Sequence, residues 1–518
     1  MTGGVQIRRW YRRSSVAERA TTGAVIAAAV ALLITSMALT PPDAHNADTS
    51  TAVAAGHTGT AQGLTPAEVA SGAAAAAGTS GSTQSSALAG AAGATGAGGA
   101  GPGGTTVAGG GKSGGVVRTA SDRGVSPTKI KIGFFLQNTA GLAGAGFSTG
   151  QRQDGPQYVD ALAKWASKNG GVAGREVVPA FRYTDPTSVE DQAAGCRAMV
   201  DDNKVFGLVD VASILDTAAL DCIVRPDGGN TPFVHSAMWS TEWQKRSGGN
   251  EVSYQAAVDR ISITWARDLA AMKWFPPGAT IGILGDKCPA TAPVVMNVLA
   301  PALKAKGAGK VVFGLHDCDI QSVVSQPGNI ATQFRLAGVT HVLVTSNFVT
   351  GQLFTNSAAS QGYHPKYSTS DWFLNTSNVT TANFDPSEFD GAIGIASQGT
   401  VLKASGKKPY DGWQVCSQIA TDAGLPPINP GDASSEELLD LCDNFRLLID
   451  AINLAGVNPT RASWRAVIPT LPARVSAQFG PSKFGPGKLS GSDFVHTLLW
   501  QASCRCYRSV SDFRPAAA

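Results

Sequence analysis

Charged residues are sparse in this chain of 518 residues. Asp, Glu, Lys and Arg make up 15% of it, and the formal net charge at pH 7 is +3. No long basic stripe follows the arginine-rich start of the chain, so a nucleic-acid partner is not expected. The sequence also lacks an H-E-x-x-H zinc motif and a phosphate-loop lysine motif, and Gly144-x-Gly146 lacks the dinucleotide spacing. These absences exclude several common enzyme classes.

No charge interrupts residues 23–39, which form an apolar run. The arginines before the run are Arg8, Arg9, Arg12, Arg13 and Arg19. Arginines in this position keep their end of an apolar segment in the cytoplasm, and a run of about 17 to 20 residues fits either a cleaved signal peptide or a spanning helix. No Cys closely follows the run, which excludes lipid attachment at a processed N-terminal Cys. We expect residues 1–40 to be a signal peptide or membrane anchor. The rest of the chain would then be exported to the outer face of the cytoplasmic membrane, either tethered or secreted.

Aromatic residues are missing from residues 41–127, where Ala, Gly, Ser and Thr dominate. Such a segment buries too little apolar surface to offset the entropy of ordering it, so we predict a disordered linker. A Gly-rich coil of this length spans roughly 50 Å. Two interpretations stay open. The segment is a tether that lets a folded head reach across a cell envelope, or it is a filler tail left after cleavage.

The rest of the chain alternates short apolar runs, typical of buried strands, with longer amphipathic segments, typical of helices. Residues 130–136 predict a strand, 151–169 a helix that stops at Gly170-Gly171, and 176–183 a parallel second strand. The alternation continues to residue 235 and begins again from 261 to 361. A further strand at 391–396 and a long helix at 436–455 follow. The predicted fold class is α/β, with two doubly wound parallel-sheet lobes joined by a hinge.

The segment Asn169-Gly-Gly-Val-Ala-Gly-Arg175, with the strand after it and the turn at Asp185, resembles the type I periplasmic binding proteins of the leucine/isoleucine/valine kind. The strand-then-Asp286 turn, Ala359–Gly362 and the helix ending at Ala451–Gly456 add to the resemblance in the same chain order. It implies a two-lobed clamshell that closes on a solute at its hinge and hands the solute to an ABC permease. It implies no cofactor and no covalent chemistry. The expected segments are lobe 1 at 128–254, lobe 2 at 255–388, a return to lobe 1 at 389–468 and a return to lobe 2 at 469–518.

Eight cysteines in an exported chain predict disulfides. The pairings we expect are Cys196 with Cys222, as recurs in the resembled family, Cys288 with Cys318, and Cys416 with Cys442. Cys504 and Cys506 are left over, because a bond between residues so close in a strand would distort the backbone. Metal ligation by His316, Asp317, Cys318 and Asp319 is a less favoured alternative, since these ligands crowd into one short loop.

Ligand-binding residues are expected beyond the carboxyl ends of the strands, where open α/β sheets bind their ligands. In lobe 1 these are Gln137, Tyr183, Asp185, Ser213 and Ser236. By position in the resembled family, Ser213 and Ser236 would hold a carboxylate, although either serine could instead cap a helix. Tyr183 would form a wall of the cleft or belong to the core.

Lobe 2 offers Asp286, Asn347, Asp371 and Trp372 at corresponding positions. An acid there would pair with an ammonium group, and Trp372 would cover an apolar side chain, whereas Asp371 could equally be a turn residue. The resemblance favours an amino acid, an amide or a related small organic acid as the solute.

The sequence offers two other candidate functions. Gly146-Phe-Ser148-Thr-Gly150 fits the nucleophile elbow of serine hydrolases, but that motif needs a strand that ends at the Ser. Here about ten residues separate Leu136 from Ser148, and His496 is the only late histidine, so a hydrolase is not expected. A sensory head that closes on a solute and signals to a protein partner stays open.

Overall fold

This computed structural model describes residues 117–517, apart from 145–146, 148–149, 212–215 and 225–229. All of them belong to one unit, Gly109–Ala518. The predictions for residues 1–40, for most of the 41–127 segment and for Ser148 and Ser213 lie outside the described residues. Within the described ranges, no helix combines the length and the hydropathy that a membrane crossing requires.

The first lobe is built on a five-stranded sheet in the order β2-β1-β3-β4-β5, with every pair parallel. The strands are β1 (Lys129–Gln137), β2 (Glu176–Thr184), β3 (Gly207–Asp210), β4 (Phe233–His235) and β5 (Glu251–Ser253). The apolar run of β1 is buried on both faces, as expected for a parallel sheet covered by helices. The strand order reverses between β1 and β3, and this reversal is where doubly wound sheets open a crevice.

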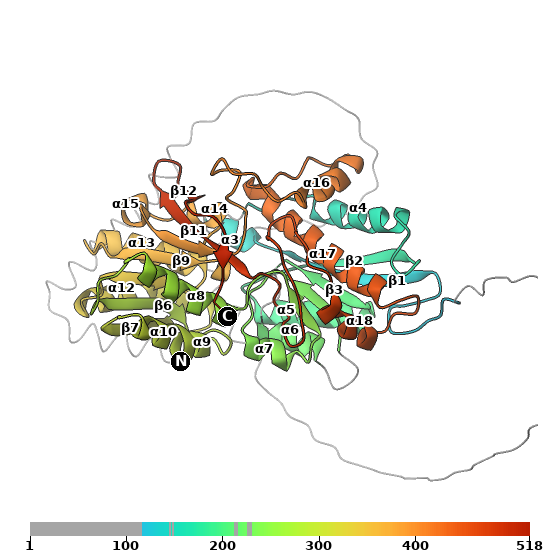
Figure 1. Cartoon of the computed structure of the whole chain (residues 1–518), viewed down its shortest axis with the longest axis horizontal. Helices are drawn as coiled ribbons and strands as arrows, with labels where there is room; N and C mark the ends of the chain where they lie inside the picture. The colour runs from blue at the N-terminus through green and yellow to red at the C-terminus, as the bar shows by residue number, and fades with distance from the viewer. Residues whose placement is uncertain (1–116, 145–146, 148–149, 212–215, 225–229, 518) are drawn as a thin grey trace, which may run out of the picture. The chain divides into compact units, whose positions relative to one another are not determined.

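Helices from two distant parts of the chain cover this sheet (Figure 1). The early ones are α4 (Gly155–Lys168), α5 (Val189–Arg197), α6 (Asp216–Ile223) and α7 (Thr241–Arg246). The late ones are α16 (Trp413–Asp422), α17 (Glu436–Leu454) and α18 (Arg461–Val467). Helix α17 packs against β3 and β4, and its Phe445 ring lies 5.4 Å from the ring of Phe134 in β1. The late segment thereby completes the core of the first lobe.

The second lobe has a larger, mixed sheet in the order β12-β11-β10-β9-β8-β6-β7, with β13 paired to β11. Its strands are β6 (Thr280–Asp286), β7 (Lys310–His316), β8 (His341–Val344), β9 (Lys366–Ser370), β10 (Ile393–Ala396), β11 (Phe494–Gln501), β12 (Cys506–Ser509) and β13 (Arg514–Pro515). The five strands from β7 to β10 are parallel and repeat the order of the first sheet, whereas β11 is antiparallel to β10. The predicted α/β fold with two sheets in separate lobes is confirmed.

Helices of the middle of the chain cover the second sheet (Figure 1). The longer ones are α8 (Val258–Ala271), α12 (Pro327–Leu336) and α13 (Phe348–Ser360). Shorter ones are α9 (Ala292–Val294), α10 (Ala300–Ala305), α11 (Ile320–Ser325), α14 (Asn378–Thr381) and α15 (Pro386–Phe389). The buried Trp265 of α8 donates a hydrogen bond to Ser368 of β9 and so fixes that helix on the sheet.

Three expected boundaries need correction. The return to the second lobe does not begin at residue 469, because Leu471, Ala477 and Phe479 belong to the core of the first lobe. Strand β10 pairs with β9 in the second sheet, so the chain returns to the first lobe after residue 396 and not at 389. The folded unit also begins before residue 128, because Val125 is buried and the amide of Thr119 donates a hydrogen bond to Asn458. Residues 117–127 are therefore part of the packed structure and not of the linker.

The three predicted disulfides, Cys196–Cys222, Cys288–Cys318 and Cys416–Cys442, are all present. The other two cysteines, whose partners the sequence left open, are bonded to each other as Cys504–Cys506. The bond is accommodated at the turn between β11 and β12, where Arg505 adopts a φ of +48°. Asp286, Cys288 and Cys318 place ligand atoms within 4.8 Å of one another, but a sulfur in a disulfide is not a thiolate and does not ligate zinc.

Candidate functional site

A cavity lies between the two lobes. From the first lobe it is lined by residues that follow β1, β3 and β4, and from the second by α14 and the residues that follow β9 and β10. Helix α17 and the loop at Gln478 complete the lining. The lining residues are Gln137, Gly150, Val211, Ser236, Leu374, Ser377, Val379, Thr380, Gln398, Glu436, Glu437, Asp440 and Gln478. In the first lobe this is the crevice at the reversal of strand order, where ligands of such sheets bind.

The first two turns of α17 bring three carboxyl groups to the cavity: Glu436, Glu437 and Asp440. Acidic residues are favourable in the first turn because unpaired backbone N–H groups give that end of a helix a partial positive charge. The opposite face of α17 carries Leu438, Leu441 and other apolar residues into the core of the first lobe. The amphipathic pattern of the helix therefore turns its acidic side toward the cavity.

Glu436 joins the two lobes. Its Oε2 accepts a hydrogen bond of 2.7 Å from Ser377, the residue that caps α14 in the second lobe. Burial raises the pKa of Glu436 to about 7, although the Ser377 hydroxyl opposes the shift. The protonation state of a contact across the cleft therefore changes near neutral pH.

Glu437 faces the first lobe. It accepts a hydrogen bond from the backbone N–H of Gln137, at the end of β1. Burial raises the pKa of Glu437 to about 7, with a smaller contribution from the nearby Asp210 carboxylate, and the Gln137 N–H acts in the opposite direction. Two carboxyl groups with similar pKa values thus lie next to each other at the N-terminus of α17.

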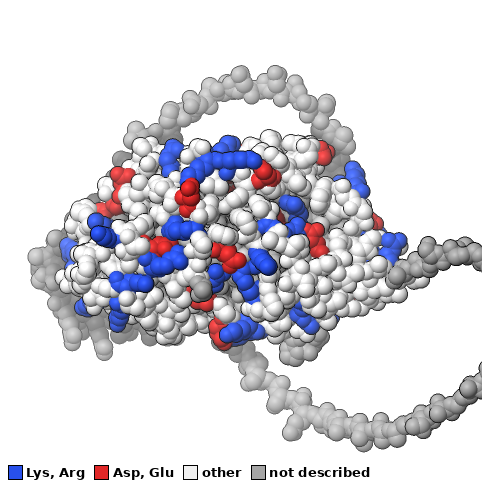
Figure 2. Space-filling view, in the orientation of Figure 1, with Lys and Arg blue, Asp and Glu red and all other residues white. Residues whose placement is uncertain are grey.

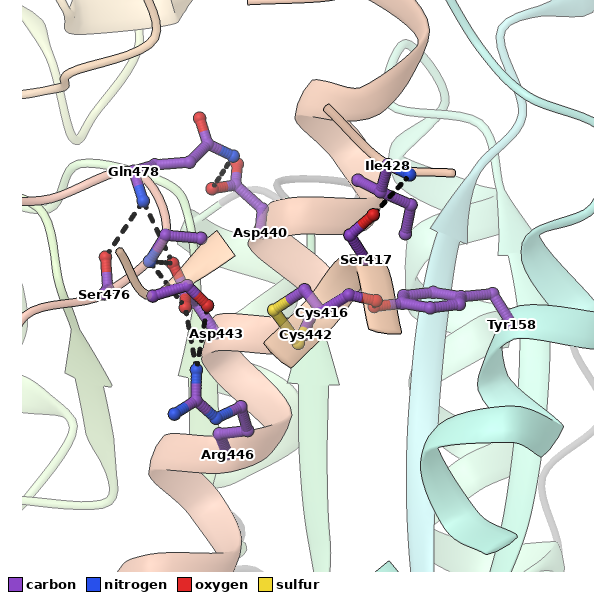
Figure 3. The surroundings of a disulfide bond; sticks show 12 residues. Tyr158, Cys416, Ser417, Ile428, Asp440, Cys442, Asp443, Arg446, Ser476 and Gln478 are labelled. Carbon is purple, nitrogen blue, oxygen red and sulfur yellow. Dashed lines mark hydrogen bonds and ion pairs between the residues drawn. A yellow bond between two sulfur atoms is a disulfide. The ribbon is translucent and has the colours of Figure 1, made fainter. Parts of the chain in front are cut away.

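Asp440 lies one turn deeper and is buried. Gln478 donates a hydrogen bond of 2.8 Å to its Oδ1, as Figure 3 shows, and the Ser236 hydroxyl also bonds to it. Ser236 is itself held by the side-chain amide of Asn444. Burial, and then the neighbouring carboxylates of Asp443 and Glu436, raise the pKa of Asp440 well above its usual range.

The acidic face of α17 is held in place by covalent and polar contacts (Figure 3). The Cys416–Cys442 disulfide fixes α17 to α16, and the hydroxyl of Tyr158 in α4 donates a hydrogen bond of 3.0 Å to the carbonyl of Cys416. One turn below Asp440, Asp443 accepts hydrogen bonds from the backbone of residues 477 and 478 and lies 3.9 Å from Arg446. These contacts fix the backbone that carries the carboxyl groups.

In the second lobe, Asp371 organises the lining. Its carboxylate accepts hydrogen bonds from the side chain of Thr376, from the backbone and hydroxyl of Ser397, and from the backbone N–H of Gln398. It thereby joins the ends of β9 and β10, the two segments that carry Ser377 and Gln398. Asp371 acts on the cavity through other residues and is not in its lining.

The cavity has a volume of about 50 Å³ in this conformation, which is room for a few water molecules. The apolar side chains of Val211, Leu374 and Val379 form part of its wall, and polar groups from both lobes converge on the remainder. A closed form that holds an organic solute therefore has its lobes further apart than in this conformation. The arrangement supports binding between two walls that each carry polar and apolar groups.

The sequence-predicted residues divide into two groups. Gln137 and Ser236 line the cavity, as expected, whereas the others that are described do not. Tyr183 packs against the core of the first lobe, Asp185 closes its own turn by accepting from Thr187, Asn347 caps α13, and Trp372 is buried in the core of the second lobe. Asp286 accepts hydrogen bonds from Cys288 and Thr291 at the end of β6. His496, weighed as a catalytic base, is buried with its ring nitrogens bonded to Ser509 and Gln398.

Sequence reasoning missed Glu436, Glu437, Asp440, Ser377, Thr380, Gln398 and Gln478. The acidic residues of α17 recur at helical spacing beside its apolar stripe, and that pattern alone is typical of a solvated helix face. The signal that could have found them was their position at the start of the long helix that returns to the first lobe. The start of α17 follows the segment in which the chain crosses from the second lobe to the first.

A second hollow lies at the other end of α17. It is lined by Asp450, Asn453, Leu454, Leu471, Pro472 and Arg474 and is open to solvent. Its one cation, Arg474, is already paired with Asp450. We do not consider it the functional site, because it lies outside the crevice and draws no residue from the second lobe.

Comparisons with known proteins support this fold. No family model and no curated protein matches the chain. Among solved structures, it is similar to a branched-chain amino acid ABC transporter protein from Thermus thermophilus with bound valine, at a TM-score of 0.58 and 13% identity, covering 75% of this chain and 97% of that one. A fatty acid ABC transporter substrate-binding protein from Thermomonospora curvata gives a TM-score of 0.58 and 13% identity, with coverage of 77% and 95%.

A third similar structure is a solute-binding protein of an ABC transporter from Rhodopseudomonas palustris BisB5 in complex with 3,4-dihydroxy benzoic acid. It has a TM-score of 0.54 and 13% identity, and the match covers 75% of this chain and 98% of that one. The structural match to leucine/isoleucine/valine-type substrate-binding proteins extends over nearly the whole of each relative. At these identities the likeness concerns the fold.

Proposed function

We propose that this chain is an extracytoplasmic solute-binding protein that captures a small solute between its lobes and presents it to an ABC permease. The observation that carries the proposal is the cavity at the carboxyl ends of β1 and β3, which residues of both lobes line. Two of the structural relatives hold valine and 3,4-dihydroxy benzoic acid, and a third is a fatty acid ABC transporter substrate-binding protein, which supports the same class of function. The four disulfides fit an oxidising compartment outside the cytoplasm.

Binding would proceed by hinge closure. The solute would enter between separated lobes and stabilise the closed form through contacts with both, so that its free energy of binding shifts the population toward closure. The hydrogen bond between Glu436 and Ser377 supports this mechanism, since it is a polar contact between the lobes that breaks when they part. The chemistry required is recognition alone, with no covalent step.

The solute classes we propose are an amino acid, an amide or a related small organic compound. The polar groups of Gln137, Ser236 and Gln398 can each bond to a small polar solute. The apolar wall at Val211 and Leu374 would contact its hydrocarbon part. A ligand with both kinds of surface fits better than a fully apolar one.

The test is a thermal-shift screen of the full chain against amino acids, amides, amines and aromatic acids. A ligand that binds only the folded protein raises the melting temperature, by an amount that grows with its concentration. The matched control is Val211→Trp, which would fill the cavity without adding charge and should remove the shift. If no solute shifts the melting temperature, or if Val211→Trp leaves every shift unchanged, the proposed function is wrong.

A further inference from the structure

The cavity between the lobes is unbalanced in charge. Three of its lining residues carry carboxyl groups, and none of the described lining residues is Lys, Arg or His. On the outer face shown in Figure 2, by contrast, basic and acidic residues are interspersed. The acidic character of the cavity is therefore not shared by the face shown in Figure 2.

Arg446 of α17 and Arg152 of the first lobe both have partners outside the cavity. Arg446 lies beside Asp443 and donates to the carbonyl of Gly412, and Arg152 pairs with Asp154. Among the described residues, no ion pair reaches Glu436, Glu437 or Asp440. Burial instead raises the pKa of both glutamates to about 7, so they hold protons at mildly acidic pH. A cation in the cavity would take the place of those protons.

A second, independent feature points to a ligand. Gln398 is 4% exposed and lines the cavity from the second lobe. Its backbone is bonded to Asp371 and His496, but its side-chain amide has no hydrogen-bond partner among the described residues. Because its amide atoms keep some exposure, the unused hydrogen bonds of this nearly buried side chain face the cavity that it lines. A polar ligand held by the carboxyl groups of α17 would come within its reach.

We propose that the cavity selects a small organic cation, a short aliphatic amine whose ammonium group is held by Glu436, Glu437 and Asp440. The proposal rests on the proposed function and names its ligand class. An ammonium group offers three donors and no acceptor, which suits carboxyl groups that act as acceptors. The Gln398 carbonyl accepts from the amine or from a second polar group, and Val211, Leu374 and Val379 contact the carbon chain.

An amine fits this lining better than a calcium or magnesium ion does. Those ions need six or more oxygen ligands, or several retained waters, around a site of fixed charge. Here apolar side chains occupy part of the wall. Asp440 already accepts hydrogen bonds from Gln478 and Ser236, so one of the three carboxyl groups has fewer free oxygen positions.

The charge balance predicts a pH signature. A bound ammonium group favours the deprotonated glutamates, so the complex carries fewer carboxyl protons than the free protein, and affinity rises as the pH passes upward through about 7. The other titratable groups near them are Tyr183, Asp210, Asp440 and Asp443, and Arg446 lies behind Asp443. Protons are therefore released on binding.

The experiment is isothermal titration calorimetry of the full chain with ethanolamine, putrescine, L-valine, benzoate and calcium chloride. We expect an amine to bind with proton release, seen as a heat that depends on the ionisation enthalpy of the buffer. Glu437→Gln should weaken amine binding by roughly tenfold or more, since it removes a charged acceptor. The matched control is Glu242→Gln, which neutralises an exposed acid in the first turn of α7 and should leave the affinity unchanged.

The outcomes separate this inference from the proposed function. If L-valine or benzoate binds in a way that Val211→Trp abolishes and neither amine binds, the inference is overturned and the proposed function stands. Calcium binding that Glu437→Gln removes, without amine binding, also overturns the inference. Amine binding with equal affinity in Glu437→Gln and Glu242→Gln would mean that the amine does not contact the carboxyl groups, which overturns it as well.

Discussion

At the scale of single residues, Arg175 holds together parts of the chain that are far apart in sequence. It is 1% exposed, and its guanidinium donates to the backbone carbonyls of Ser126, Ala173, Val457 and Thr119 and to the side chain of Asn458. The start of the folded unit, the glycine motif and the loop after α17 therefore share one anchor. Arg175 is therefore part of the scaffold of the first lobe.

We predict that Arg175→Ala lowers the free energy of unfolding by roughly 3 kcal/mol or more, because several buried carbonyls lose their donor at once. Urea unfolding followed by tryptophan fluorescence measures this loss. Arg197→Ala is the control, since Arg197 is exposed at the end of α5 and should cost little. Equal losses in the two variants would show that Arg175 is not an anchor.

The glycine motif before Arg175 permits a prediction that compares two neighbours. Gly170 and Gly171 both have positive φ, at +93° and +73°. A Cβ on Gly171 would lie 2.5 Å from the carbonyl oxygen of Arg175, whereas a Cβ on Gly170 would meet nothing within 4 Å. Gly170→Ala should therefore cost only the conformational strain of about 1 kcal/mol. Gly171→Ala should cost clearly more, because the backbone must also shift.

Melting temperatures of the two glycine variants, measured side by side, test this difference. We expect Gly171→Ala to melt several degrees below Gly170→Ala, since about 1 kcal/mol moves the melting temperature of a large domain by roughly 2–4 °C. A smaller loss in Gly171→Ala than in Gly170→Ala would contradict the close approach to Arg175.

At the scale of elements, the disulfides differ in what they constrain. Cys416–Cys442 closes a loop of 26 residues and joins two buried helices, whereas Cys504–Cys506 spans a separation of 2 at a hairpin turn. In the chain-entropy model the longer loop contributes about 3.5 kcal/mol, and the short one contributes far less. We predict that replacing Cys416 and Cys442 together by Ala lowers the free energy of unfolding by about that amount. Replacing Cys504 and Cys506 together by Ser should have a small effect.

Urea unfolding of the two double variants, each compared with the wild-type chain, measures these contributions. The hairpin variant serves as the control for the loss of a disulfide as such. A loss in the hairpin variant equal to that in the helix variant would mean that loop length does not govern the stabilisation. Because the Cys416–Cys442 disulfide holds α17 in position, the Cys416/Cys442 variant should also bind solute more weakly. The Cys504/Cys506 variant should bind it as the wild-type chain does.

The elements also mark how far sequence reasoning reaches. The strands and the doubly wound order were predictable, because buried apolar runs such as residues 130–136 can be recognised from the local sequence alone. The lining of the cavity could not be predicted in this way. Whether Glu436 faces solvent or the second lobe depends on Ser377, and whether Asp440 is buried depends on Gln478. Both partners lie tens of residues away in sequence, and no local pattern records these contacts.

Cys504–Cys506 illustrates the same limit at a turn. In an extended strand the bond would distort the backbone, and that reasoning assumed a continuous strand. The structure instead ends β11 at Gln501 and begins β12 at Cys506, so a hairpin turn with Arg505 at positive φ absorbs the distortion. Of the two disulfides of lobe 1, Cys196–Cys222 was expected because it recurs in the resembled family. No helix was expected at residues 413–422, so the pairing of Cys416 with Cys442 did not rest on a helical pattern.

At the scale of the whole molecule, the raised pKa values of Glu436 and Glu437 link stability to pH. In the unfolded chain a Glu titrates near its ordinary value of about 4.5, whereas both folded pKa values are about 7. Between these values the folded state binds more protons than the unfolded state. The stabilisation from the two protonated glutamates is therefore fully present below about pH 4.5 and is lost as the pH rises through about 7.

Replacing both glutamates by Gln should remove this dependence, because Gln has nearly the shape of a protonated Glu and does not titrate. At a pH of about 4.5 we expect the variant and the wild-type chain to be about equally stable. At a pH of about 8 the variant should be more stable, by roughly 3 kcal/mol, after the full shift of the two groups is reduced by about half for screening by water in the cavity. Comparing the two chains at each pH cancels the opposite contribution of His496, whose pKa burial lowers to about 4.

Urea unfolding of both chains across this pH range provides the measurement. The difference in free energy of unfolding should grow steadily between the two pH limits and level off above the folded pKa values. A difference that is constant with pH would mean that these carboxyl groups are solvated like ordinary surface acids. The cavity could then not exchange their protons for a bound cation, because a cleft already open to water leaves no raised pKa for a ligand to lower.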